Sequence, residues 1–214
     1  MRGLIYVPVL HSPADLGSLA EDVRGRFVAA FGLDAWERKA ASVEAMWQGI
    51  RERLLGLPLD WPRVRLYQDG LPVCADTERI ARDLAAGGSR NHELLLELAG
   101  RGAALMGTED PAILVREYRH VQRLAEAARG PLPKATLEEL ARLGTTLLAE
   151  RDRAIARRID ETLGEAETGI LFIGLLHRVD ELLEGKVELR PLIHTLPFGA
   201  DLWRRVPEGE GHGD

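Results

Sequence analysis

The chain alternates between short apolar segments typical of β-strands and longer amphipathic segments typical of helices. Residues 170–176 are apolar except for Gly174, as in a strand that helices cover on both faces. Gly169 and Gly174 would be unfavourable inside a helix, which favours the strand. Residues 178–184 then predict a short amphipathic helix, and residues 186–190 alternate like a strand. This order predicts a right-handed crossover between two parallel strands.

Three more segments have the character of strands. Residues 4–10 are rich in β-branched and aromatic side chains, residues 63–68 end at an Asp-Gly turn signal, and residues 102–107 are short and apolar. Pro8 has no N–H group to donate to a neighbouring strand. We therefore expect Pro8 at the end of its strand or on a side that is not paired.

Long stretches between these strands have helical periodicity. Residues 13–56 predict helix with a break near Gly32, and further helices are expected at 76–86, 89–100, 110–128 and 136–163. Within 34–56, apolar side chains recur at steps of three and four, and we interpret this face as core, with ligand stacking by its two tryptophans as the alternative. Its members are Trp36, Ala40, Val43, Trp47, Ile50 and Leu54.

Together these elements predict an α/β fold. It has a mainly parallel central sheet of about four to five strands flanked by helices, and the helical segment 13–56 is inserted after the first strand. The 214 residues are 45% hydrophobic and 29% charged, which fits a globular protein. We expect residues 1–205 to form a single α/β domain and the glycine-rich, acidic residues 206–214 to form a flexible tail.

Charge and composition limit the partners that we expect. A net charge of -6 argues against nucleic acid or an anionic membrane as the main partner. No apolar run approaches the roughly 20 residues that span a bilayer, and the start of the chain does not have the pattern of a signal peptide. The single cysteine, Cys74, fits a reducing compartment. We therefore expect a cytoplasmic protein without a nucleic-acid or membrane partner.

Polar residues follow four of the predicted strands: His11, Asp69, Glu109 and His177. The carboxyl ends of parallel strands share one edge of a sheet, which is where open parallel sheets bind ligands. Histidines and carboxylates together could bind a divalent metal such as Zn, Mn or Co. They could equally form a metal-free acid–base pair, because histidine titrates near neutral pH. The spacing of these residues along the chain does not separate the two interpretations.

Charged residues at two helical positions are candidates for substrate binding. Arg151 and Asp152 interrupt the apolar stripe of helix 136–163, so we expect them to pair with each other or to face a polar cavity. The predicted members of this stripe are Leu137, Leu140, Gly144, Leu148, Ile155 and Ile159. Arginine also suits recognition of a carboxylate or phosphate. Arg90 and His92 lie in the first turn of helix 89–100, where free N–H groups favour an anion, although a solvated helix start is the alternative.

Residues 150–159 and 170–177, with the helix and strand after them, resemble the C-terminal part of the TraB/PrgY/Tiki family, within the wider erythromycin-esterase and ChaN-like group. Gly174-Leu-Leu-His177 is similar to the late Gly-x-x-His motif of that family. Residues 8–11 resemble its early motif with proline in place of glycine. The resemblance, mainly over 150–193 and 4–11, implies a metal-dependent peptidase or hydrolase. It would make His11, Glu109 and His177 metal ligands or bases, and Arg151 the holder of an anionic substrate group.

Three functions remain open from the sequence. The first is a hydrolase, metal-dependent or not, with its His/carboxylate site at the C-terminal edge of the sheet. The second is a non-catalytic binder or sensor of a small anionic metabolite held by Arg90, His92 or Arg151. The third is a scaffold protein that forms a homodimer through helix 34–56. Walker, Gly-x-Gly-x-x-Gly, His-Glu-x-x-His and Gly-x-Ser-x-Gly motifs do not occur in the sequence, which does not identify a substrate.

Overall fold

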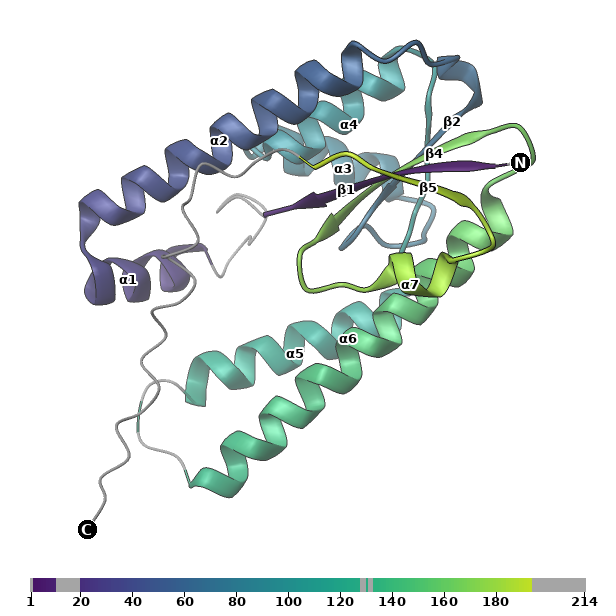
Figure 1. Ribbon diagram of the computed structural model, residues 1–214. Coiled ribbons are helices and arrows are strands. Elements are labelled where there is room, and N and C mark those ends of the chain that lie inside the picture. The colour runs from purple at the N-terminus through teal and green to yellow at the C-terminus, as the bar shows by residue number, and fades with distance from the viewer. Residues whose placement is uncertain (1, 11–19, 128–129, 131–132, 194–214) are drawn as a thin grey trace.

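A computed structural model describes residues 2–10, 20–127, 130 and 133–193. Five parallel strands form one sheet in the order β3-β2-β4-β1-β5 (Figure 1). The strands are β1 (Gly3–Val9), β2 (Val64–Gln68), β3 (Ala104–Leu105), β4 (Thr168–Gly174) and β5 (Glu188–Pro191). The predicted α/β fold with a parallel sheet is confirmed.

Helices cover both faces of this sheet. The helices before β3 are α1 (Ala20–Phe31), α2 (Leu33–Leu55), α3 (Thr77–Ala86) and α4 (Arg90–Gly100). The later helices are α5 (Pro111–Ala127), α6 (Lys134–Thr162) and α7 (Val179–Leu183), and a 3-10 turn, η2 (Trp61–Arg63), precedes β2. Helices α1 and α2 follow β1 as predicted, and the break between them falls at Gly32, which has a φ of 86°. A positive φ favours glycine at this position.

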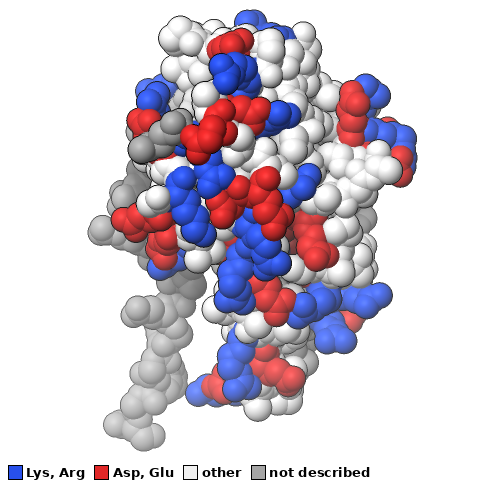
Figure 2. All heavy atoms as spheres, turned by 90° about the vertical axis from the view of Figure 1, so that its right-hand side faces the viewer, with Lys and Arg blue, Asp and Glu red and all other residues white. Residues whose placement is uncertain are grey.

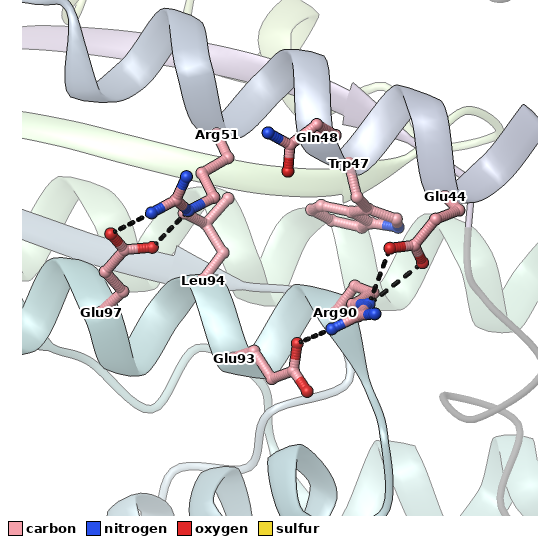
Figure 3. Close-up of a pocket in the computed structure, with 8 residues that line it drawn as sticks. All are labelled: Glu44, Trp47, Gln48, Arg51, Arg90, Glu93, Leu94 and Glu97. Carbon is pink, nitrogen blue, oxygen red and sulfur yellow. Dashed lines mark hydrogen bonds and ion pairs between the residues drawn. The ribbon is translucent and has the colours of Figure 1, made fainter.

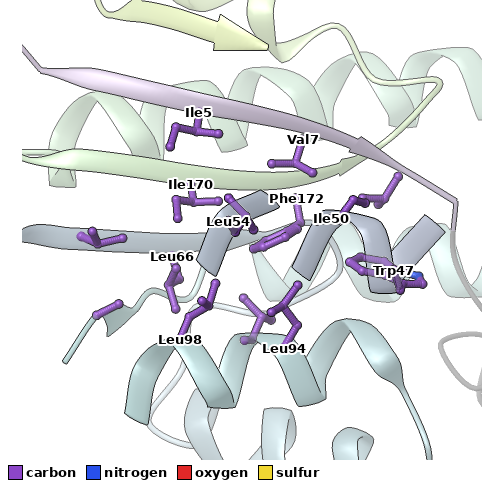
Figure 4. Packing of buried hydrophobic residues seen from close by; sticks show 14 of the residues in the cluster. Ile5, Val7, Trp47, Ile50, Leu54, Leu66, Leu94, Leu98, Ile170 and Phe172 are labelled. Carbon is purple, nitrogen blue, oxygen red and sulfur yellow. The ribbon is translucent and has the colours of Figure 1, made fainter. Parts of the chain in front are cut away.

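Helices α2 and α4 pack on one face of the sheet (Figure 4). Trp47, Ile50 and Leu54 of α2 and Leu94 and Leu98 of α4 share a buried cluster with side chains of β1, β2 and β4. Both tryptophans of α2 are buried, so they belong to the interior as expected. This apolar face of α2 is therefore buried within the chain.

Helices α6 and α7 pack on the opposite face. Ile155 and Ile159 of α6 contact Leu171 and Ile173 of β4 in a second buried cluster. Strand β4 supplies side chains to both clusters and is covered on both sides, which explains its continuous apolar sequence. Each fully buried aliphatic or aromatic side chain of β4 contributes roughly 1.5–3 kcal/mol to stability.

Pro8 lies where its missing N–H group costs nothing. Strand β1 lies between β4 and β5, but its pairing with β5 ends at Tyr6, opposite Pro191. The carbonyl of Tyr6 accepts a hydrogen bond from Leu192 N at 2.8 Å, so it faces β5. Backbone groups two residues apart face the same neighbour. Pro8 therefore faces the β5 side beyond the last paired residue, as its chemistry predicted.

Three local predictions were too long or out of phase. The strand predicted at 102–107 pairs only at Ala104–Leu105, because the chain then turns against the loop that follows β2. The strand predicted at 170–176 ends at Gly174, and Leu176 is 80% exposed in the following turn. In α6 the inward position is Leu147 rather than Leu148, and Leu137 is exposed.

Gly107 allows the loops after β2 and β3 to meet. A Cβ atom at this position would lie 2.6 Å from the carbonyl oxygen of Pro72 and 2.7 Å from the Cα of Val73. We expect Gly107→Ala to lower the free energy of unfolding by about 1–3 kcal/mol, because backbone would have to move. Chemical denaturation measures the change. Gly100→Ala is the control: its Cβ would meet nothing within 4 Å, so it should be neutral or stabilising.

The surface mixes charges of both signs. On the face shown in Figure 2, Lys and Arg side chains alternate with Asp and Glu, without a broad area of one sign. Many charged side chains of the described residues are paired, for example Arg65 with Glu167 and Arg190 with Glu188. This face therefore lacks the continuous basic surface that a nucleic-acid backbone requires. Among the described residues, no helix combines the length and apolar character needed to cross a membrane.

Candidate functional site

Five of the predicted site residues meet at the C-terminal edge of the sheet. Asp69 directly follows β2, Glu109 lies in the loop after β3, and His177 follows the turn after β4. Arg151 and Asp152 reach the same edge from the inward face of α6. Each of the five residues is at most 8% exposed. Charges this well shielded from water interact much more strongly than surface charges do.

His177 lies between two carboxylates. Its Nδ1 is 2.5 Å from Asp152 Oδ1, and its Nε2 is 3.6 Å from Asp69 Oδ2. The other oxygen of Asp152 accepts a hydrogen bond from the backbone N of Arg178 at 3.1 Å, which fixes the carboxylate. Because a carboxylate only accepts, the ring carries a proton on Nδ1. A neutral ring would then present the lone pair of Nε2 toward Asp69.

Asp69 joins the ends of β2 and β4. Its Oδ2 accepts a hydrogen bond from Gly174 N at 2.8 Å, and its Oδ1 accepts one from Gln68 Nε2 at 2.6 Å. The backbone N of Asp69 donates to the carbonyl of Phe172 at 3.1 Å. The aspartate therefore has a defined orientation toward His177 rather than the loose geometry of a solvated turn.

Arg151 and Glu109 form a buried two-pronged ion pair. Arg151 Nε and Nη2 donate to Glu109 Oε2 and Oε1 at 2.7 and 2.6 Å, and Arg151 Nη1 donates to Glu117 of α5. Burial alone would lower the pKa of Arg151, but hydrogen bonding to Glu109 and the charges of Glu109, Glu117 and Asp69 outweigh burial and raise it. Arg151 therefore pairs with carboxylates from other elements rather than with its neighbour Asp152.

Tyr6 of β1 is affected both by burial and by carboxylates near this edge. Burial raises the pKa of its phenol, and the negative charges of Asp180, Asp152 and Asp69 raise it further. An interaction with the side chain of Asp180 adds to the rise in the pKa of Tyr6. Neither residue was predicted from the sequence. Asp180 could have been noticed because it lies three residues after His177, but Tyr6 has no signal beyond an inward position in a strand.

Two predicted residues lie elsewhere, and one cannot be placed. Arg90 is on the surface that α4 turns toward α2, where its Nε donates to Glu44 and its Nη1 to Glu93. His92 is buried, with Nδ1 2.7 Å from Ser89 Oγ. Ser89 Oγ also accepts a hydrogen bond from His92 N, so one amide of this helix start already has a partner. His11 lies outside the described residues.

The predicted metal ligands were His11, Glu109 and His177. Both oxygens of Glu109 accept hydrogen bonds from Arg151, and Oε1 also accepts one from Gly70 N at 2.6 Å. Within the part of the chain that the structure describes, no group of three or more His, Cys, Asp or Glu side chains is arranged to hold a metal ion. Of the described residues, His177 Nε2 and Asp69 Oδ2 supply two donors, and the predicted ligand His11 lies outside the described part of the chain. We therefore derive no chemical step through a metal.

Comparison of the chain with protein-family models, curated proteins and solved structures found no match. The resemblance to the TraB/PrgY/Tiki family thus stays a prediction.

Proposed function

We propose that the protein is a hydrolase in which His177 acts as the general base. The observation that carries this proposal is the buried Asp152–His177–Asp69 arrangement, with 2.5 Å between His177 Nδ1 and Asp152 and 3.6 Å between Nε2 and Asp69. A carboxylate on Nδ1 fixes the tautomer and stabilises the imidazolium that forms during catalysis. The ring then presents Nε2 to a reacting group, as a general base requires.

The separation between Nε2 and Asp69 suits a water molecule shared by the two. A polar contact longer than 3.5 Å is commonly bridged by water. In this proposal the water donates one hydrogen to Nε2 and the other to Asp69 Oδ2. His177 takes the first proton while the water oxygen attacks the substrate, and the imidazolium then gives that proton to the leaving group. Asp69 orients the water, and the charge of Asp152 stabilises the protonated ring.

The charges of the site favour a substrate whose reacting group is neutral. Arg151 directs three donor nitrogens at Glu109 and Glu117, so it has already been neutralised. Asp69 and Asp152 leave the edge negative, as the raised pKa of Tyr6 also indicates. An anionic group would be repelled here. These contacts support a charge-compensating role for Arg151 and argue against the anion-binding alternative.

A survey of neutral esters and amides tests the proposal. We expect hydrolysis of at least one class, and we expect Asp69→Asn to lower its kcat by roughly 10–100-fold, because one hydrogen bond to a charged group contributes about 1.5–3 kcal/mol. Arg178→Ala is the control, since this neighbouring side chain is exposed and pairs only with Glu181 among the contacts described. Absence of turnover throughout the survey, or full turnover in Asp69→Asn, would contradict the assignment.

Metal dependence can be separated from this mechanism. We expect dialysis against a chelator to leave turnover unchanged, because His177 and Asp69 activate water without a Lewis acid in the proposed scheme. The measurement compares kcat before and after dialysis, with bound metal quantified by mass spectrometry. Loss of turnover that zinc, manganese or cobalt restores would instead place a metal at this edge, as the family resemblance implies.

A further inference from the structure

Buried polar atoms without partners gather at one place in the fold. Among the described residues, five buried side-chain nitrogen or oxygen atoms have no hydrogen-bond partner. Four of them belong to Trp47, Gln68 and Asn91, and the fifth is Nδ1 of His120 between α5 and α6. An unpaired buried polar group costs about 1–3 kcal/mol. Such a group usually indicates a bound water, an ion or a functional role.

The three side chains lie on the α2/α4 face near the C-terminal edge of the sheet. Gln68 is paired in register with Phe172, whose ring centroid lies 6.1 Å from that of Trp47. In Figure 4, strand β1, which carries Val7, points toward the end of the cluster where Trp47 lies. Asn91 is buried one turn before Leu94 and Leu95, on the same inward face of α4. Helix α4 leads into β3, so its beginning lies toward the C-terminal edge.

A groove between α2 and α4 opens beside Trp47, whereas Gln68 and Asn91 lie beneath the surface and do not line it. It has a volume of about 240 Å³ and is lined by Trp47 and Leu94, with charged residues around it (Figure 3). The arginines on this rim are already paired: Arg51 with Glu97, and Arg90 with Glu44 and Glu93. The groove therefore offers an apolar wall and no uncompensated arginine to attract an anion.

The unpaired atoms have complementary chemistry. Gln68 Nε2 donates to the backbone oxygen and Oδ1 of Asp69, which fixes its amide and leaves Oε1 as an acceptor. Trp47 Nε1 can only donate, and Asn91 can do both. A carbonyl oxygen could accept from both Trp47 Nε1 and Asn91 Nδ2, and two N–H groups could donate to Gln68 Oε1 and Asn91 Oδ1. An unsubstituted carboxamide supplies all of these groups, and a peptide unit supplies the carbonyl and one N–H.

We propose that Trp47, Gln68 and Asn91 form a subsite that binds an uncharged carboxamide or peptide unit of the substrate. This inference rests on the hydrolase function proposed above and names the substrate class of that enzyme. Gln68 links the subsite to the reacting centre, because its Nε2 holds the same Asp69 whose Oδ2 faces His177. The subsite binds the substrate at a distance from the bond that is cleaved.

Indole resonances of the full-length protein provide the test. The chain has four tryptophans, so its ¹⁵N-labelled form should give four indole N–H peaks, and Trp47→Phe identifies the one from Trp47. We expect N-acetylglycinamide to shift the Trp47 peak in a saturable way. The anionic N-acetylglycine and the cationic glycinamide should bind more weakly than the neutral probe, by a factor of about ten at least. Asn91→Leu and Gln68→Met should each weaken binding of the neutral probe about tenfold, the equivalent of one hydrogen bond.

Gln122→Leu is the matched control, because it removes an exposed amide of α5, a helix that does not line the groove. It should leave probe binding unchanged. An unmoved Trp47 peak, equal shifts with all three probes, or undiminished binding in both Asn91→Leu and Gln68→Met would overturn the subsite. The remaining indole peaks report whether each variant is folded. Probe binding without turnover of any substrate would reject the hydrolase function and retain the subsite. Turnover without probe binding would reject the subsite and retain the hydrolase function.

Discussion

Replacing Arg151 with methionine should lower the free energy of unfolding by about 3–5 kcal/mol. Glu109 is 0% exposed, and both of its oxygens accept hydrogen bonds from Arg151. Without the guanidinium, a buried carboxylate would remain charged and uncompensated, or it would have to take up a proton. The loss should be measured by urea denaturation near neutral pH, where an unpaired carboxylate is most costly.

Two further variants test whether the expected loss of stability comes from the buried Arg151–Glu109 ion pair. Arg116→Met removes a half-exposed arginine of α5 that pairs with Glu150 of α6. This substitution should lower the free energy of unfolding by less than about 1 kcal/mol. Combining Arg151→Met with Glu109→Gln should restore part of the lost stability, because the orphaned charge disappears. Equal losses for Arg116→Met and Arg151→Met would show that the pair is no more than a surface contact.

Substitution of His177 by asparagine should reduce kcat on a hydrolysed substrate by about 10²–10⁴-fold, the usual contribution of a general base. Asparagine keeps a polar side chain but does not take up a proton near neutral pH. Asp152→Asn should lower kcat by a comparable factor, because an amide facing Nδ1 can favour the wrong ring tautomer. KM should change little in both variants, since neither residue forms the proposed carboxamide subsite.

The tautomer can be observed separately from turnover. Nitrogen chemical shifts of the His177 ring in ¹⁵N-labelled protein should show the proton on Nδ1 in the wild type, because Asp152 accepts it at 2.5 Å. Asp152→Asn should change these shifts while the backbone spectrum is retained. A tautomer that does not respond to Asp152→Asn, together with unchanged kcat, would assign Asp152 a purely structural role.

Much of the architecture could be predicted because it follows from local chemistry. The doubly covered strand β4 has a continuous apolar run, Ile170–Ile173, and Ser89 accepts a hydrogen bond from His92 N at the start of α4, a common role for serine at that position. The length of β3 could not be predicted. Its pairing stops after Ala104 and Leu105 because of the contact between two loops at Gly107, and that contact involves residues distant in the chain.

The site was predicted in part for a similar reason. Strand ends in a parallel sheet share an edge, so Asp69, Glu109 and His177 could be grouped from topology alone. The side chains that pair with these three residues could not be predicted. Arg151 contacts Glu109 across 42 positions, and periodicity along α6 shows only that Arg151 points inward. Gln68 was hidden because a polar side chain at the end of a strand resembles the start of a turn.

The placement of β1 has a consequence for protein synthesis. Strand β1 leaves the ribosome before both of its partners: it pairs with β4, from Gly3 opposite Thr168, and with β5, from Gly3 opposite Glu188. Strand β2 also depends on β4 for its place in the sheet. While the ribosome is still translating the residues before 168, β1 and β2 would have unpaired edges of the kind that associate with other chains. Helices can form early, but emergence of residues 168–191 is the event that turns the nascent chain into a folded sheet.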